Sequence, residues 1–86
     1  MPAMSRSKDA LEAWQRADAD ARIVEARLLA VWDLYEKGLV AAPDEALLRD
    51  VFRLRAAANE RLMGAIAVLG ALSSEAQNAR RSADTA

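Results

Sequence analysis

The sequence predicts an all-α protein in which two long helices form an antiparallel hairpin. Glycine and proline, the residues that interrupt helices most strongly, number only three and two among 86 residues. Apolar residues recur in steps of three and four on both sides of a central break at residues 38–43. Short connections between helices favour antiparallel neighbours. The chain therefore divides into a flexible N-terminus at residues 1–8, a hairpin at residues 9–73 and a disordered polar tail at residues 74–86.

The first helix is expected over residues 9–37. Asp9 followed by Glu12 resembles a capping box at its start. Gly38 suits the left-handed position that follows a helix, and Leu39 then takes the place from which a Schellman motif reaches back to Leu34. One apolar stripe runs along this helix with the period of a coiled-coil seam. It consists of Ala10, Trp14, Ala17, Ala21, Val24, Leu28, Val31 and Tyr35.

A connection at residues 38–42 leads to a second helix, which is expected over residues 43–73. Pro43 fixes φ for a first turn, and the acids that follow it favour the positive end of the helix dipole. Gly64 and Gly70 fall inside this helix, where they either permit close helix approach or mark irregular turns. The stripe of this helix consists of Leu48, Val51, Phe52, Arg55, Ala58, Leu62, Ile66 and Leu69.

The apolar arc of both helices is wider than one neighbouring helix can cover. Leu11, Leu29 and Trp32 flank the first stripe, and the uncharged run 62–72 is apolar on almost all sides. Small domains without disulfides or metals often gain the missing stability by oligomerising. We expect a homo-oligomer, most simply a dimer that forms a four-helix bundle, with a heteromeric helical partner as the alternative. The predicted interface consists of Trp14, Leu28, Trp32, Tyr35, Phe52, Leu62, Ile66 and Leu69.

Arg55 and Asn59 interrupt the second stripe and allow three interpretations. A polar pair in a seam can fix the register and the oligomeric state. Arg55 could instead line an anion-binding groove with other arginines of the same helix. The third interpretation is that the helix diverges from its neighbour there, so that the arginine reaches water.

The residue inventory argues against an enzyme. The chain has neither Cys nor His, which removes thiolate nucleophiles, imidazole bases and the best zinc ligands. No phosphate-binding loop, dinucleotide fingerprint or serine elbow occurs, so no catalytic residue, metal or cofactor is expected. The sequence favours a small protein-interaction module, such as an adaptor, an accessory protein or a chaperone-like subunit.

Two alternatives use the arginines. A nucleic-acid-binding regulator would bind through a set of arginines that do not form one tidy face, namely Arg49, Arg53, Arg61, Arg80 and Arg81. An all-helical enzyme would bind an anionic metabolite around Arg55, but two helices enclose little space.

Charge and hydropathy predict a soluble, cytoplasmic protein. The net charge is −1, and the polar segment 1–8 lacks the features of a secretory signal. The longest uncharged apolar run spans residues 62–72, whereas crossing a bilayer takes roughly 20 residues. The preference for Arg over Lys and the high alanine content indicate the coding bias of a GC-rich bacterial genome.

Overall fold

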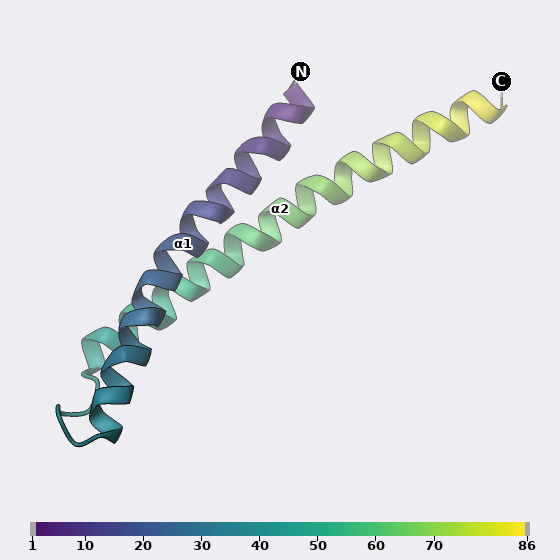
Figure 1. Ribbon diagram of the computed structural model, residues 1–86. Helices are drawn as coiled ribbons and strands as arrows, with labels where there is room; N and C mark the ends of the chain where they lie inside the picture. Colours follow the sequence, from purple (N-terminus) through teal and green to yellow (C-terminus); the bar gives the residue numbers. More distant parts are fainter. Residues whose placement is uncertain (1, 86) are drawn as a thin grey trace.

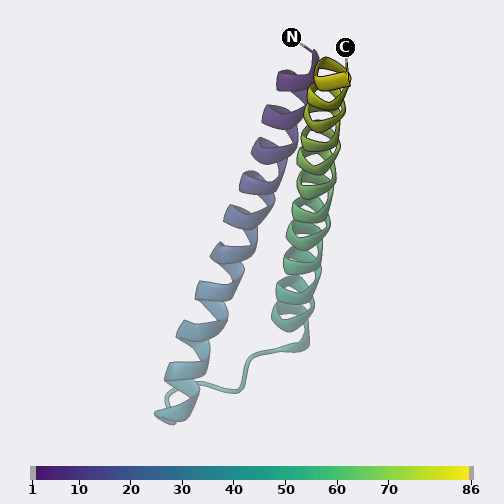
Figure 2. The same ribbon diagram turned by 90° about the vertical axis from the view of Figure 1, so that its right-hand side faces the viewer.

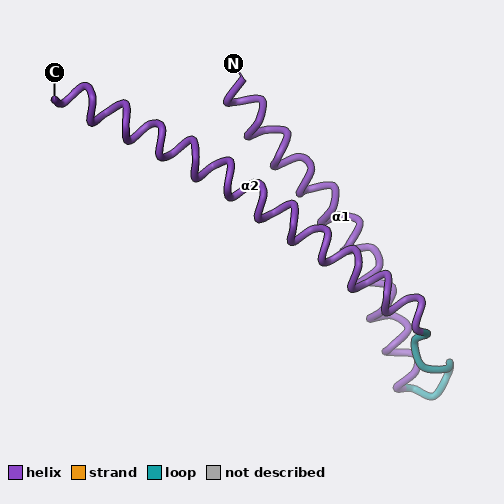
Figure 3. The backbone as a smooth tube through the Cα atoms, turned by 180° about the vertical axis from the view of Figure 1, so that it is seen from behind, coloured by secondary structure: helices purple, strands orange, loops and turns teal. Residues whose placement is uncertain are grey.

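Two helices make up the protein. The computed structural model describes residues 2–85, with side chains described over residues 5–83. Helix α1 spans Pro2–Glu36 and helix α2 spans Glu45–Thr85, with no strand in this part of the chain. Residues 37–44 connect them (Figure 3). The all-α class and the two-helix order predicted from the sequence are confirmed.

The helix pair is extended and forms no compact unit. The molecule measures 72 × 20 × 15 Å and its radius of gyration is 20.2 Å, whereas a compact protein of this length has about 12 Å. The helices lie side by side near the connection and separate toward the two termini (Figure 1). A view turned by 90° shows them running antiparallel along each other (Figure 2). Two rods of this length cannot enclose a common core.

Helix α1 ends in the Schellman motif that the sequence predicts. Gly38 has a φ of 74°, in the left-handed region that glycine adopts without steric cost. The Leu39 amide donates to the Leu34 carbonyl at 3.0 Å, and the Gly38 amide donates to the Tyr35 carbonyl at 2.9 Å. These two bonds satisfy carbonyls that the end of the helix would otherwise leave without partners.

Helix α2 begins at Glu45, two residues later than predicted, because Asp44 and not Pro43 forms its N-cap. The Asp44 side chain accepts a hydrogen bond from the Leu47 amide at 2.8 Å, which is the N-cap arrangement. Pro43 lies before this cap, in the connection. The connection therefore covers residues 37–44 instead of 38–42.

Both helices extend into segments for which the sequence predicts no fixed structure. Helix α1 begins at Pro2, inside the predicted flexible segment 1–8, and α2 continues through the predicted tail to Thr85. Residues 1 and 86 of those segments lie outside the described residues. Pro2 suits a first helical position, and alanine, glutamine, glutamate and arginine between residues 71 and 81 favour helix intrinsically. The prediction relied on missing apolar residues and gave this propensity too little weight.

The side chains that the helix pair buries most completely are small. Among the residues described, the buried apolar ones are Ala21, Val24, Ala58 and Ala65, at 0–8% exposure. No side chain larger than valine is fully enclosed in this part of the chain. Gly64 and Gly70 do not mediate the approach, because an added Cβ would meet nothing within 4 Å at either position. Neither of the two roles predicted for them is observed, since α2 is continuous through both.

Neither helix contains, within residues 2–85, a stretch that is long and apolar enough to cross a bilayer.

We expect Gly38→Ala to lower the free energy of unfolding by about 1 kcal/mol, because alanine at this φ is strained although space for its Cβ is free. Gly64→Ala is the matched control. It adds the same methyl group in open space within a helix, so stability should rise by about 0.5–1 kcal/mol. Urea unfolding followed by circular dichroism measures both, and equal effects of the two variants would contradict the assignment of Gly38 as the helix stop.

Candidate interaction surface

An ion-pair cluster joins the two helices near the middle of their contact. The Nε of Arg55, on α2, donates to Glu25 Oε2 at 2.9 Å, and a second guanidinium nitrogen donates to the other oxygen of the same carboxylate. The third nitrogen donates to Asp18 Oδ1 at 2.9 Å. Arg22 binds the remaining oxygen of Asp18 at 2.8 Å. The four residues form a neutral network, which we call the Arg55 cluster.

The cluster shifts the titration of its members. The hydrogen bond from Arg55 holds the pKa of Asp18 below its ordinary value, and the same interaction lowers the pKa of Glu25. The pKa of Arg55 is raised, chiefly by its hydrogen bond to Glu25. Partial burial of the cluster opposes each shift, but charge-assisted hydrogen bonds outweigh it.

Arg55 fixes the height of α2 relative to α1. Asp18 and Glu25 are seven residues apart, or about 10 Å along the helix axis, and Arg55 spans the distance between them. A shift of α2 by one turn, about 5.4 Å, would break one side of this bridge. Inter-helix ion pairs contribute more to specificity of register than to net stability.

The position of Arg55 distinguishes between the three interpretations of the sequence. Its side chain is 33% exposed and lies against α1, so the interpretation in which it turns away into water is wrong. All three guanidinium nitrogens already bind carboxylates of the same chain. This favours a role in register over an anion-binding groove. Asn59, one turn along α2, is exposed.

The side of the helix pair that carries the Arg55 cluster also carries most of the exposed apolar surface of the helices. Because a helix has 3.6 residues per turn, residues three, four, seven, eleven or fourteen positions from a cluster member lie on roughly the same side of that helix. On α1 these include Leu29 and Trp32, counted from Glu25, and on α2 they include Leu48 and Phe52, counted from Arg55. Six large apolar side chains at such positions are 37–74% exposed, whereas Leu28, Val51 and Leu62, at similar spacings, are partly buried between the helices. The apolar face is defined by Leu29, Trp32, Leu48, Phe52, Ile66 and Leu69.

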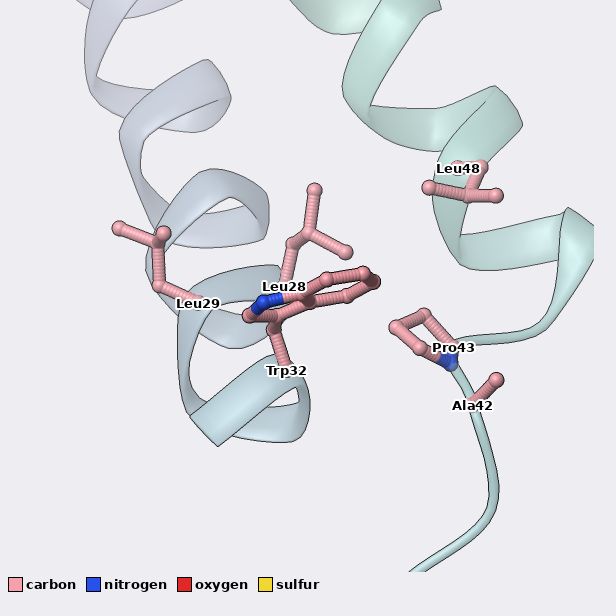
Figure 4. Close-up of a pocket in the computed structure, with 6 residues that line it drawn as sticks. All are labelled: Leu28, Leu29, Trp32, Ala42, Pro43 and Leu48. Carbon is pink, nitrogen blue, oxygen red and sulfur yellow. The ribbon is translucent and has the colours of Figure 1, made fainter. Parts of the chain in front are cut away.

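A groove of about 530 Å³ opens on this face beside the connection, lined by Leu28, Leu29, Trp32, Ala42, Pro43 and Leu48. The Trp32 ring extends from α1 toward Pro43, and Leu48 faces the same space from α2 (Figure 4). The indole N–H donates to Glu36 Oε1 at 2.7 Å, so the polar atom of the tryptophan is bonded within its own helix. The groove therefore presents an almost wholly apolar lining.

The predicted interface residues divide into two groups. Trp14, Leu28 and Leu62 are partly buried, while the other five remain exposed in the helix pair. The rings of Trp32 and Tyr35 lie 5.7 Å apart in a tilted arrangement. The exposed group consists of Trp32, Tyr35, Phe52, Ile66 and Leu69.

Sequence reasoning missed the partners of Arg55. Asp18 precedes Arg22 by four residues, a spacing that by itself predicts only a surface pair, and that pair does form. The available signal was the spacing, because Asp18 and Glu25 lie seven residues apart beside the α1 stripe. Acid and base with the same spacing of four residues, Asp33 with Lys37 and Glu45 with Arg49, also form pairs at the surface.

The arginines proposed for nucleic-acid binding are not gathered on one face. Arg49 pairs with Glu45 at 3.5 Å, and Arg53 pairs with Asp50 at 3.3 Å. Arg61 lines a shallow pocket with Ala10 and Ala13 on the side of the helix pair away from the Arg55 cluster. Arg80 and Arg81 lie near the end of α2, some 30 Å along the helix from Arg61 at about 1.5 Å per residue. Within residues 5–83, no three His, Cys, Asp or Glu side chains come together as a metal site.

Comparison with known proteins finds no matching family model, no similar curated protein and no similar solved structure.

The Arg55 cluster predicts that stability falls in acid. Asp18 and Glu25 have lowered pKa values in the folded state, so the unfolded chain takes up protons first as the pH falls below their ordinary values of 3.8 and 4.5. The contribution of the cluster is complete above about pH 5 and is lost as the pH falls toward the lowered folded values. We expect the urea midpoint to be level between pH 7 and pH 5 and to decrease below that range.

Arg55→Gln should make this acid-dependent decrease shallower, because the two carboxylates lose the donor that lowers their pKa values. Arg53→Gln is the matched control, since it removes a surface pair with Asp50 on the same helix. Urea unfolding at several pH values measures both variants. Equal pH profiles of Arg55→Gln and the unmodified protein would contradict the assigned role of the cluster.

Proposed function

We propose that this chain is a small helical protein-interaction module that associates with a second copy of itself through the apolar face. The observation that supports this most strongly is the exposure of six large apolar side chains on the one side of the helix pair that carries the Arg55 cluster. Surface apolar residues scattered singly need no explanation, but six large ones on one side of a helix pair are typical of an interaction site.

The exposed area of the chain supports the same proposal. The accessible surface is 6709 Å², whereas a compact protein of 9.3 kDa exposes about 5,000 Å². The excess is about 1,700 Å², and a stable interface buries about 800 Å² on each partner. One further copy offers enough surface to cover the apolar face.

Association as a dimer would complete a four-helix bundle. Each helix would then have two neighbours, one within its own chain and one from the other copy. Both the apolar stripe of the helix and the apolar residues that flank it would become buried. This accounts for an apolar arc wider than one neighbouring helix needs. In such a module the outer faces carry the charged residues and remain available for further contacts, as in adaptors and accessory subunits.

Size-exclusion chromatography with light scattering on the purified chain tests the proposal. The expected mass is twice the 9.3 kDa of the single chain at micromolar concentrations, with dissociation on dilution. A fully helical species of 9.3 kDa throughout a hundredfold concentration range would contradict it.

Two matched variants test which face is used. Leu29 and Ile23 are 69% and 61% exposed on α1, but Ile23 lies two residues before Glu25 and so on the opposite side of the helix. We expect Leu29→Glu to raise the dimer dissociation constant at least tenfold, about 1.4 kcal/mol, because it places a charge in the apolar interface. Ile23→Glu should leave the constant unchanged. Equal effects of the two substitutions, measured by light scattering, would contradict the assignment of the face.

A further inference from the structure

The residues of α2 on the side of the Arg55 cluster form a row that is symmetric in character. Its members follow each other in alternating steps of four and three, the spacing of one side of a coiled-coil helix. Position 57 is the midpoint of the row, and each member has a counterpart of the same kind, apolar or polar, at the same distance beyond that midpoint. We call this row the outer row of α2. It consists of Leu48, Phe52, Arg55, Asn59, Leu62 and Ile66.

An outer row with the same symmetry runs along α1. Its midpoint is position 20, with a leucine at each end and an acid and a base on either side of the midpoint. Both rows lie on one side of the helix pair, because Arg55 of the first row binds two acids of the second. The outer row of α1 consists of Leu11, Gln15, Asp18, Arg22, Glu25 and Leu29.

The midpoints of the two rows lie at the same height. Arg55 binds both Asp18 and Glu25, so it is level with the midpoint between these acids, at about position 21 or 22 of α1. The helices run antiparallel (Figure 2). Position 57, which is two residues farther along α2, is therefore level with about position 20 of α1. A single two-fold axis across the helices can pass through both midpoints.

From this shared midpoint we infer that two copies pack their outer rows together in opposite directions, with α2 antiparallel to the second α2 about position 57 and α1 antiparallel to the second α1 about position 20. The inference rests on the self-association proposed above and specifies its geometry. The second copy fits this surface because each row, when reversed, is complementary to itself.

Reversal of α2 sets residues of one kind against each other. Leu48 comes opposite Ile66 of the second copy, and Phe52 comes opposite its Leu62, so apolar side chains cover one another. Arg55 comes opposite Asn59 of the second copy. A guanidinium carries five N–H groups, of which three bind carboxylates within the chain. Two N–H groups therefore remain to donate to the side-chain oxygen of this asparagine, which is exposed within one copy.

Reversal of α1 about the same axis gives an equally good match. Leu11 comes opposite Leu29 of the second copy, and Asp18 comes opposite its Arg22, so opposite charges meet. The arrangement also covers side chains that one copy leaves exposed, since Leu29 is 69% exposed and Phe52 is 74% exposed.

A two-fold axis along the helices matches the same surface less well. Such an axis leaves every height unchanged and sets α1 against α2 of the second copy. Arg55 then comes level with Arg22 of the second copy, and Phe52, about one turn closer to the connection, comes level with Glu25. Like charges and a carboxylate against an aromatic ring are both costly in an interface.

The polar pair also distinguishes between registers of the antiparallel arrangement. The next register of a coiled coil is a slide of seven residues. It would set Arg55 against Ile66 and Asn59 against Leu62, so that polar groups face apolar ones. Only the register centred on position 57 pairs the polar residues with each other.

The first experiment measures the direction and the register of the two copies. The chain has no cysteine, so Ala46→Cys and Ala71→Cys, prepared separately, each place one spin label at an exposed site of α2. The label pairs of the dimer should lie about 33 Å and about 42 Å apart along the helices, because the two sites are 11 and 14 residues from the midpoint. Pulsed electron spin resonance measures both distances.

The alternatives give other distances. An axis along the helices leaves both label pairs within the width of a four-helix bundle, about 30 Å or less. A slide by seven residues lengthens one distance and shortens the other by about 10 Å.

The second experiment traps the contact between Leu48 and Ile66. In the double variant Leu48→Cys with Ile66→Cys, the two sites of one chain lie about 27 Å apart along the helix, so a disulfide can only join two copies. We expect a covalent dimer after mild oxidation. Leu48→Cys with Ser73→Cys is the matched control, because Ser73 continues the outer row and faces Leu48 only after a slide of seven residues. All three sites are exposed, so both variants should keep the helicity of the unmodified chain.

The outcomes separate the inference from the proposed function. A dimer with both label distances at or below about 30 Å, or one in which the control pair forms disulfides as readily as Leu48→Cys with Ile66→Cys, overturns the arrangement and leaves self-association in place. A folded monomer at all concentrations overturns both. A dimer with the two expected label distances, trapped only by the first cysteine pair, supports both.

Discussion

The small side chains between the helices are the constraint on which the rest of the structure depends. Alanine at positions 21, 58 and 65 lets the two helices approach closely, but an alanine side chain buries little apolar area. Two rods in contact also have no interior in which a tryptophan or phenylalanine could be enclosed. Several large apolar residues are partly buried between the helices, but many others, such as Leu29, Phe52 and Ile66, are left exposed. The proposed association would supply the burial that is missing within one chain.

The Arg55 cluster determines where α2 lies along the length of α1. Arg55 and the two acids on α1 set the height of α2 relative to α1, because their bonds are satisfied at one height only. The apolar groove depends on that height as well, because its lining combines residues of α1 with Leu48 of α2. The relative height of the two helices thus determines the shape of the surface that the proposed dimer would use.

Much of the fold could be predicted from the sequence, because local rules determine it. The Schellman motif at Gly38 follows from residues within six positions of one another, and the spacing of three and four identifies both helices. The length of α2 was mispredicted because propensity alone sustains helix after Leu72, where no apolar stripe continues. The separation of the two helices toward their far ends could not be predicted, because the stripe pattern gives no measure of how far two helices diverge.

The sequence predicted only part of the candidate surface. Periodicity identified the apolar residues that remain exposed, such as Phe52 and Ile66. The partners of Arg55 could not be identified in this way, because pairing across helices depends on their relative height and rotation, which one sequence does not encode locally. Asp18 looked like a member of a surface pair with Arg22, and only the packing of α2 adds its second arginine.

The central claim is that the helix pair owes much of its stability to association, and the concentration dependence of unfolding tests it most directly. Urea unfolding followed by circular dichroism over a hundredfold range of chain concentration is the measurement. If folding and association are coupled, the midpoint rises steadily with concentration. A midpoint that stays constant over the whole range, with full helicity before unfolding, would show that one copy is stable by itself and would contradict the account.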